Sequence, residues 1–283
     1  MNFYEQNYRA LIRNILDFGH KKEGRNGATR SLFGQTLTIR LQGGFPLLTG
    51  RKMYPTGIFG ELSCFVHGEE LLTEYKKAGC NYWDANAAQW DENKGKPDNE
   101  VSIGQYVGSL WRAFYAYDEV LSDFNADRDQ LRMIQQQLRV NPLSRRHVLA
   151  AWHPGAKSCL PPCTVMAIFE SDGKTLNCHV TQRSADLCLG VPSDVAQYAL
   201  LVHLLARDAG LLSGNLMFTF VDAHIYEAHM EPLTEYMRSK FYMLPRLRFK
   251  EEDNFFDALT FEPEDAWLEN YTHGPAIKFP FVV

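Results

Sequence analysis

The fold class is decided by residues 160–209, LPPCTVMAIFESDGKTLNCHVTQRSADLCLGVPSDVAQYALLVHLLARDA. Two strand-like runs, residues 164–170 and 175–183, flank the letters SDGK, and Asp-Gly between such runs is typical of a β-hairpin. Residues 195–209 have helical spacing and are apolar over more than half of their surface, which predicts a buried helix. A hairpin that leads into a buried helix indicates a sheet covered by helices.

The rest of the chain alternates between the same two patterns. Residues 4–20 place leucine and isoleucine on one helical stripe, whereas residues 35–41 and 146–152 read as strands. Strands and helices interleave without a strict βαβ rhythm, so we expect an α/β or α+β fold with a large mixed β-sheet packed with helices. No repeat or linker divides the chain, and we expect a single catalytic domain over residues 1–283.

Charge and cysteine content exclude several classes of protein. The 283 residues carry a formal net charge of −5 and no Lys/Arg-rich run, whereas a duplex-binding protein needs a basic surplus to neutralise phosphates. No apolar stretch is long enough to span a bilayer, and the N-terminus lacks the apolar segment of a signal peptide. Six cysteines in a chain of this length are not a disulfide scaffold. We therefore expect a cytoplasmic protein with reduced thiols, no nucleic-acid polymer and no membrane as a partner.

Cys163 in LPPCTV is the first candidate for chemistry. Two prolines stiffen its approach and a strand follows, and a thiolate held at such a turn near positive charge is a nucleophile. Burial as a small apolar side chain is the alternative, because free cysteines are often inert core residues. A Cys-His hydrolase would need a base beside the thiol, and Thr164 occupies the next position.

Three polar clusters could surround such a nucleophile. Arg145 and Arg146 match phosphate geometry, although a solvated strand edge also explains them. A second cluster follows an apolar strand: Gln182, Arg183, Ser184 and Asp186. A third has strand spacing: Asp222, His224 and Tyr226. Each of these two clusters could form the wall of a site. The alternative for the second cluster is a capped helix start, and the alternative for the third is a half-solvated strand. No zinc spacing, P-loop or GxGxxG occurs, so we expect no metal, dinucleotide or triphosphate.

The order of these motifs resembles the thymidylate synthase family nearly end to end. That family shows a Pro-Cys nucleophile, an Arg-Ser-x-Asp segment, a Gly-x-Pro-x-Asn-x-x-x-Tyr helix start and an Asp-x-His-x-Tyr segment. The matching letters here are LPPC, QRSAD, LGVPSDVAQYALLVHLLAR and DAHIYEAHM, with further likeness in LQGGFPLLTGRK, GELSCFVHG, NPLSRRHVLAAW and AIKFPFVV. The resemblance implies the family fold, a homodimer formed through one sheet face, and folate-dependent one-carbon transfer to a pyrimidine nucleotide.

The resemblance also implies roles for individual residues. Cys163 would add to C6 of the pyrimidine, and Glu61 would organise waters and relay protons at the base. The 5′-phosphate would be held by arginines, the last two from the partner subunit: Arg25, Arg183, Arg145 and Arg146. Other nucleotide contacts would come from Gln182, Ser184, His224 and Tyr226. The co-substrate 5,10-methylenetetrahydrofolate would contact Trp83, Asp186, Gly190 and Val283. The charge of the arginines would also lower the pKa of the Cys163 thiol.

Asp194 departs from the family, which has at this position an asparagine that reads the uracil edge. Uracil offers an N3–H donor and an O4 acceptor, whereas cytosine offers an N3 acceptor and an N4 amine donor. An ionised aspartate only accepts hydrogen bonds, so it repels O4 and accepts from the amine. An unpaired buried polar edge costs roughly 1–3 kcal/mol, which favours cytosine over the alternative of a neutral exchange. A proton shared with N3 would also make C6 more electrophilic, which gives Asp194 a catalytic role.

Two further departures concern the fate of the transferred carbon. Thr164 replaces a family histidine, and Asn86 replaces the second tryptophan of a Trp-Asp-x-Trp patch that keeps Trp83. Both resemble the dCMP hydroxymethylases of T-even phages, which implies the cytosol of a bacterium or a phage-infected host. The exocyclic methylene at C5 takes hydride to give methyl, or water to give hydroxymethyl. A wetter site favours water, and we expect 5-hydroxymethyl-dCMP, although Trp90 could replace the lost ring.

Other readings stay open from the sequence. Within the superfamily they are a dCMP 5-methyltransferase, a dUMP or CMP hydroxymethylase, and thymidylate synthase. Ser184 and Arg145 are the residues found in the family members that act on deoxynucleotides, which favours a deoxyribose in the substrate. The family has a tyrosine directly before a glycine, where this chain has Val107, and the nearest tyrosine is Tyr106, one place earlier. This shift leaves open whether Tyr106 can relay protons as the family tyrosine does. A nucleotide- or RNA-binding protein on the same scaffold is the alternative without catalysis, and the intact Cys163 argues against it.

Overall fold

The computed structural model describes residues 2–24, 26–114, 129–250 and 256–282. Its α-helices are α1 (Phe3–Phe18), α2 (Pro55–His67), α3 (Leu72–Lys77), α4 (Asp84–Gln89), α5 (Val107–Arg112), α6 (Gln130–Val140), α7 (Gly190–Asp208) and α8 (Met230–Arg238). Its strands are β1 (His20–Gly24), β2 (Gly27–Arg40), β3 (Val148–Ala150), β4 (Thr164–Ser171), β5 (Thr175–Gln182), β6 (Ala185–Asp186), β7 (Leu212–Tyr226), β8 (Arg246–Phe249) and β9 (Ala266–Glu269). Short 3-10 turns include η5 (Glu227–His229) and η7 (Pro263–Asp265). No helix within these ranges combines the length and the apolar character needed to cross a membrane.

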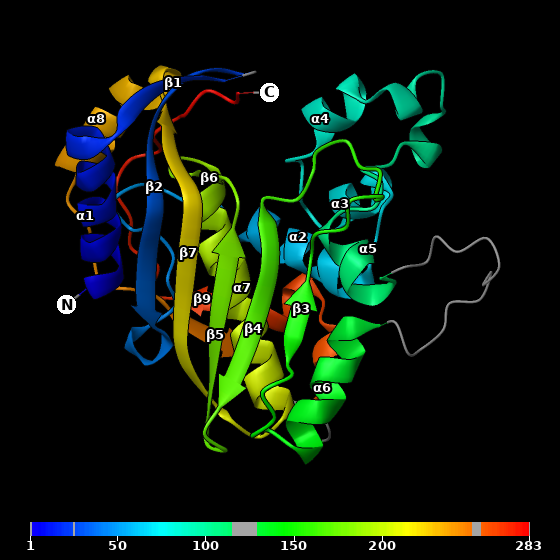
Figure 1. Ribbon diagram of the computed structural model, residues 1–283. Coiled ribbons are helices and arrows are strands. Elements are labelled where there is room, and N and C mark those ends of the chain that lie inside the picture. The colour runs from blue at the N-terminus through cyan, green and yellow to red at the C-terminus, as the bar shows by residue number, and fades with distance from the viewer. Residues whose placement is uncertain (1, 25, 115–128, 251–255, 283) are drawn as a thin grey trace.

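Seven of the described strands form one mixed sheet (Figure 1). Six lie in the order β1-β2-β7-β5-β4-β3, and β6 pairs with β7 off this path. β5 and β6 run parallel to β7, whereas the other neighbours are antiparallel. The helix α7 lies between β5 and β7 in sequence, as the crossover between parallel strands requires. The predicted mixed sheet packed with helices is confirmed.

The hairpin and the buried helix that were predicted from the sequence are both present. Asp172 Oδ1 accepts the N–H groups of Lys174 and Thr175, at 2.9 and 2.7 Å, in the turn between β4 and β5. Gly173 has a φ of 85°, a conformation that favours glycine. The helix α7 begins earlier than predicted, because Pro192 is tolerated in the first turn of a helix.

Two predicted strands differ in length from those observed. The strand expected over residues 35–41 is the second half of β2, which bends at Gly34, where φ is 70°. The strand expected over residues 146–152 is only β3. Single hydrogen bonds at His147 and Ala151 extend its pairing with β4 by one residue at each end, and the chain then turns away.

The two faces of the sheet have different environments. The helices α7 and α2 lie behind the sheet in Figure 1 and cover one face. Fully buried side chains point to that side: Leu176, Val180, Leu216 and Phe218. On the other face the strand register aligns one row: Val148, Ile168, His179 and Met217. Val148 is 42 % and Met217 37 % exposed, so apolar side chains remain uncovered on this face, from the edge strand β3 to the inner strand β7, in a single chain.

Candidate active site

Cys163 ends a loop that Arg183 holds in place directly before β4. Arg183 Nε donates to the carbonyl oxygen of Pro162, and Arg183 Nη2 donates to that of Pro161, each over 3.0 Å. The backbone N–H of Arg183 donates to the Cys163 carbonyl oxygen over 2.9 Å. The thiol is free and half-buried. The end of β5 therefore fixes the position of the predicted nucleophile at the start of β4.

The surroundings of Cys163 disfavour a thiolate in the single chain. Burial raises the pKa of the Cys163 thiol to about 11, and the charge of Asp194 adds to this rise. The guanidinium of Arg183 lowers the pKa but does not outweigh these effects. Arg183 thus lowers the pKa of this thiol as expected, although the net pKa in one chain is raised. Formation of the thiolate needs further positive charge or a proton acceptor.

Arg145 and Arg146 lie far from the nucleophile of their own chain. Phe169 N–H donates to the carbonyl oxygen of His147 over 2.9 Å, which places the arginine pair beside the far end of β4. A strand rises about 3.3 Å per residue, so Cys163 and Phe169 are separated by roughly 20 Å. Both arginines are exposed. One protomer does not bring these two predicted phosphate ligands to its own Cys163.

Glu61 is a buried carboxyl on α2 that two donors hold. Trp83 Nε1 donates to Glu61 Oε1 over 2.6 Å, and Gln197 Nε2 donates to Glu61 Oε2. Burial raises the pKa of Glu61 to about 7, with a further rise from the charge of Asp194. Such a group can accept and return a proton near neutral pH. Gln197 was missed in the sequence, where its position one helical turn after Asp194 was the available signal.

Asp194 lies in the first turn of α7, beside the end of β5. Gln182 Nε2 donates to Asp194 Oδ2 over 2.6 Å and to Thr164 Oγ1 over 3.3 Å. Burial is the main cause that raises the pKa of Asp194 to about 6, whereas the hydrogen bond from Gln182 lowers it. Gln182 is fully buried. The three side chains form an enclosed polar row in which the carboxyl of Asp194 is an acceptor.

Glu61, Trp83 and Asp194 line one cavity of about 350 Å³. This volume falls in the range of small-molecule sites. Its walls also include a side-chain amide, a glycine and three residues near the C-terminus: Asn86, Gly190, Ile277, Phe279 and Phe281. Trp90 is not among the described residues that line it, because its ring tip packs against Gly104. Trp90 therefore does not replace the tryptophan that the family has at position 86.

Tyr106 lies beside the same group of residues. Its ring meets that of Trp83 edge-on, with 4.5 Å between the ring centroids. Burial raises the pKa of the Tyr106 hydroxyl well above its ordinary range, and the charges of Cys163 and Asp194 raise it further. The tyrosine is therefore close to the predicted nucleophile although Val107 occupies the family position. The sequence showed the displacement but could not show the direction of the side chain.

A second cavity, of about 320 Å³, gathers most of the predicted phosphate and sugar contacts. Four predicted residues line it together: Arg183, Ser184, His224 and Tyr226. Lys22 from β1 also lines it and pairs with Asp222, and neither role was predicted. His224 is buried, with Nδ1 3.2 Å from the Asp222 carbonyl oxygen. The predicted contact Arg25 lies outside the described residues.

Asp186 and Gly190, two predicted folate contacts, flank the entrance to α7. Asp186 Oδ1 accepts the backbone N–H of Cys188 over 2.8 Å and lies 3.6 Å from Nδ1 of His229. Gly190 begins α7 and borders the cavity that contains Trp83. The last predicted contact, Val283, lies outside the described residues.

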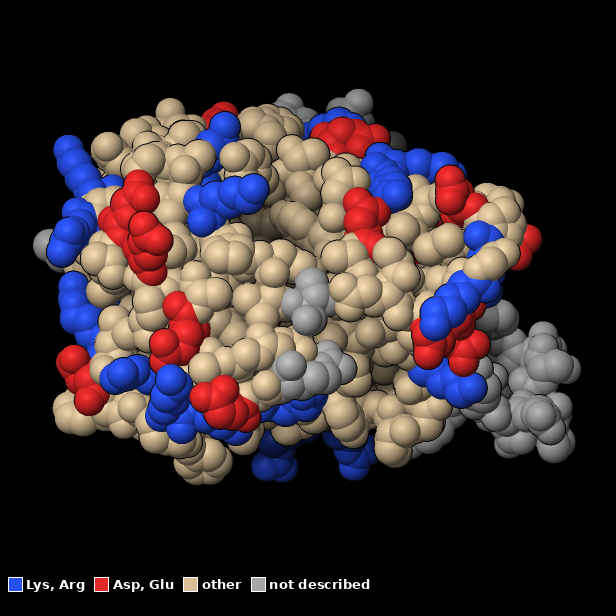
Figure 2. Space-filling view, turned by 90° about the horizontal axis from the view of Figure 1, so that it is seen from above, with Lys and Arg blue, Asp and Glu red and all other residues tan. Residues whose placement is uncertain are grey.

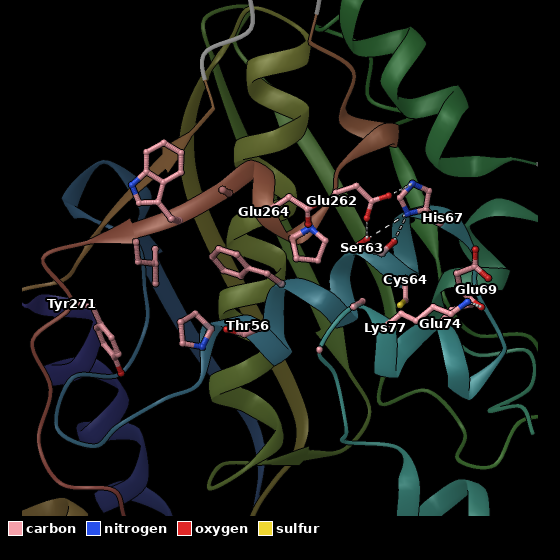
Figure 3. Close-up of a pocket in the computed structure, with 18 residues that line it drawn as sticks. Thr56, Ser63, Cys64, His67, Glu69, Glu74, Lys77, Glu262, Glu264 and Tyr271 are labelled. Carbon is pink, nitrogen blue, oxygen red and sulfur yellow. Dashed lines mark hydrogen bonds and ion pairs between the residues drawn. The ribbon is translucent and has the colours of Figure 1, made fainter. Parts of the chain in front are cut away.

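A further cavity, of about 760 Å³, lies beside α2 and is lined by Ser63, Cys64 and His67 of that helix (Figure 3). Ser63 and His67 from α2 face Glu262 there, and the Ser63 hydroxyl donates to Glu262 Oε2 over 3.2 Å. Cys163 and Asp194 are not among the described residues that line it. This cavity is therefore separate from the predicted nucleophile.

The end of the molecule seen in Figure 2 carries charges of both signs. Lys and Arg side chains alternate with Asp and Glu around hollows that uncharged residues wall. Neither sign dominates this face, which differs from the continuous basic surface expected of a protein that tracks a phosphate backbone.

A comparison with protein-family models agrees with this architecture. The model described as thymidylate synthase matches residues 6–283, nearly the whole chain. Membership indicates a one-carbon transferase that modifies C5 of a pyrimidine with the help of a folate. The mixed sheet, the cysteine at the start of β4 and the match over almost every residue lead to one conclusion: the chain belongs to the thymidylate synthase family.

Proposed function

We propose that this protein is a dCMP 5-hydroxymethylase that uses Cys163 as its nucleophile. The observation that carries the proposal is the half-buried carboxyl of Asp194, which Gln182 holds by a 2.6 Å hydrogen bond at the wall of the cavity. A family member that binds a uracil nucleotide needs a hydrogen-bond donor to O4 of the base at this position. A carboxyl group supplies an acceptor, and cytosine presents an amine there.

The geometry around Asp194 supports cytosine in a specific way. The hydrogen bond from Gln182 occupies Oδ2 and leaves Oδ1 for the N4 amine of the base. The pKa of about 6 means that Asp194 carries a proton in part of the molecules near neutral pH. A proton between the carboxyl group and N3 completes a bidentate pair and withdraws electrons from C6. The same residue thereby selects the base and favours attack on it.

The proposed chemistry follows from covalent addition. The Cys163 thiolate adds to C6, and C5 becomes nucleophilic and takes up the one-carbon unit that 5,10-methylenetetrahydrofolate supplies when bound. Glu61, with its pKa of about 7, is positioned to exchange protons through water at the base. Loss of the C5 proton and departure of tetrahydrofolate from the transferred carbon leave an exocyclic methylene at C5. Addition of water to that carbon and departure of Cys163 from C6 give 5-hydroxymethyl-dCMP.

Residues of the 350 Å³ cavity fit a folate and water together. Trp83 and the side chains of Phe279 and Phe281 offer apolar walls for a planar ring, and Asp186 lies beside the entrance to α7 as an acceptor for ring N–H groups. Asn86 is a polar side chain in the same wall. A site with a polar residue at this point excludes water less well than one with a second indole, which supports hydration over hydride transfer.

We also propose that two chains pair through the uncovered face of the sheet. The exposed row at Val148 and Met217 is the kind of apolar surface that a partner subunit covers. Arg145 and Arg146 adjoin this face at β3 and are remote from Cys163 of their own chain. Across a two-fold axis they would reach the second cavity of the partner subunit and bind the 5′-phosphate there. Their charge would also supply the stabilisation that the Cys163 thiolate lacks in one chain.

The direct test is the mass of the product from dCMP, CMP or dUMP incubated with 5,10-methylenetetrahydrofolate. Addition of CH2O to dCMP is the expected result, and tetrahydrofolate is then released without oxidation. Addition of CH2 with formation of dihydrofolate would show a methyltransferase instead. Turnover of dUMP alone would contradict the proposed role of Asp194. The Cys163→Ala variant is the control and should form no product.

A further inference from the structure

Three polar side chains meet beneath the C-terminal segment, and two of them, Cys188 and His229, have no role in the reaction described above. The carboxylate of Asp186, the thiol of Cys188 and the imidazole of His229 place their ligand atoms within 4.8 Å of one another. His229, from η5, is fully buried, and its ring packs edge-on against those of Tyr226 and Phe279, each at 5.5 Å. The arrangement connects the start of α7 with the end of the chain.

The hydrogen bonds of His229 define where its protons are. His229 Nε2 lies 2.8 Å from the carbonyl oxygen of Pro280, and because a carbonyl only accepts, Nε2 carries a hydrogen. A neutral ring would then direct the lone pair of Nδ1 at Asp186 Oδ1, 3.6 Å away. Nδ1 has no hydrogen-bond partner among the described residues. Two electron-rich atoms facing each other inside the protein require a cation between them, and a proton on Nδ1 is the simplest one.

Arg51 makes a second connection between the same two segments. Arg51 Nη2 donates to the carbonyl oxygen of Cys188 over 2.5 Å, and its guanidinium lies 4.6 Å from the centre of the Phe279 ring. Residues 186–188 are thus tied to residues 279–280 twice. Phe279 lines the 350 Å³ cavity, so the position of the C-terminal segment determines the shape of that wall.

We propose that His229 is a positioning residue for the folate: as an imidazolium it joins Asp186 to Pro280 and so holds the C-terminal segment against the cavity. The inference rests on the proposed function, because it takes Asp186 and Phe279 as walls of the folate site. His229 itself is fully buried behind these residues and touches neither substrate. Its effect is on the affinity for the folate and not on the nucleotide.

Electrostatics near His229 agree with this geometry. Burial lowers the pKa of His229, but Asp186 and the Pro280 carbonyl oxygen outweigh it, and the net pKa is raised. The charged or titratable groups facing the ring are Asp186, Arg51, Cys188 and Tyr226. A raised histidine pKa means that the connection is complete at low pH and is lost as the pH rises through that value. The loss therefore begins above about pH 6.5, the ordinary value of histidine.

The test compares His229→Phe with a chain that ends at Phe279. The phenylalanine keeps the ring packing and removes both polar contacts. Binding of tetrahydrofolate to the nucleotide complex, measured by quenching of tryptophan fluorescence, should weaken about tenfold or more in each variant, since hydrogen bonds to charged groups contribute about 1.5–3 kcal/mol. The Kd of the nucleotide should change less than about twofold. Adding His229→Phe to the shortened chain should weaken binding little further, because that chain already lacks Pro280, the acceptor of His229 Nε2.

Other outcomes would overturn the inference. Additive effects of the two changes, or an equal loss of nucleotide affinity, would mean that His229 only stabilises the fold. Weakening of folate binding by a chelator, or by Cys188→Ala, would mean that a bound metal and not a proton bridges the cluster. In the wild type alone, folate affinity should fall as the pH rises above about 6.5, and a flat profile would contradict the imidazolium. A methyl product or a uracil substrate would refute the proposed function and leave this test intact.

Discussion

Gln182 Nε2 donates to Asp194 Oδ2 over 2.6 Å, and this bond connects the end of β5 to the first turn of α7. The bond orients the carboxyl group whose identity separates this chain from family members that read uracil. Because the same nitrogen lies 3.3 Å from Thr164 Oγ1, both amide hydrogens of Gln182 are used within the protein. The base therefore meets a carboxyl group whose Oδ1 can accept from the N4 amine, while Oδ2, which uses one lone pair for Gln182, can still share a proton with N3.

Replacing Asp194 by asparagine should transfer activity from cytosine to uracil nucleotides. The amide can donate to O4 of uracil, whereas it leaves the N4 amine of cytosine facing a donor in one orientation. An unpaired polar edge costs roughly 1–3 kcal/mol, so kcat/KM for dCMP should fall about tenfold to a hundredfold while that for dUMP rises. Product mass with each nucleotide measures the change. An unchanged ratio would remove Asp194 from base selection.

The stability of the protein should depend on the buried carboxyl of Glu61. Burial raises its pKa to about 7, so the folded state holds a proton that the unfolded chain loses near pH 4.5. The free energy of unfolding should therefore decrease between about pH 4.5 and pH 7, by on the order of 1–3 kcal/mol, and level off above. Urea titrations of wild type and Glu61→Gln across this range isolate the effect.

The Glu61→Gln variant should lack this part of the pH dependence, since its amide does not titrate. The difference in unfolding free energy between variant and wild type should grow in favour of the variant as the pH rises to 7. A difference that is constant with pH would show that Glu61 does not carry a raised pKa in the folded protein.

Restoring an indole at position 86 should change the product. Asn86 lies in the cavity wall near Trp83, and a tryptophan there would displace water from the region of the exocyclic methylene. The Asn86→Trp variant should form a larger fraction of methyl product, with a matching amount of dihydrofolate detected by absorbance. Asn86→Leu removes the polar group without the ring and is the matched control. Pure hydroxymethyl product in both variants would mean that Asn86 does not control hydration.

Mixed dimers should reveal whether the site is shared between chains. Cys163→Ala and Arg146→Ala should each lose most activity alone, the first through the nucleophile and the second through phosphate binding. If Arg146 serves the partner subunit, mixing the two inactive variants should restore activity, because one site of each heterodimer then contains both intact residues. Activity measured after co-refolding tests this. Failure to recover activity, with heterodimers shown to form, would place Arg146 outside the site.

Local patterns in the sequence determined the hairpin of β4 and β5, the helix α7 and the candidate Cys163, and the resemblance to a family added Glu61 and Asp194. These features depend on residues close together in the chain: Asp-Gly between strand-like runs, an apolar helical face, and a motif around each reactive side chain. Periodicity and short motifs can therefore be read without knowledge of the rest of the molecule.

Only the tertiary structure decided how these residues act on one another. Trp83, which directly precedes α4, and Gln197 from α7 both donate to Glu61, and the ring of the displaced Tyr106 packs against that of Trp83. The tertiary structure also showed that Arg146 lies far from Cys163 of the same chain. Such contacts join positions distant in sequence, and pKa values depend on burial and on neighbouring charges that packing alone brings together. For that reason the reactive groups could be identified from the sequence, whereas their protonation states and contact partners could be determined only from the folded structure.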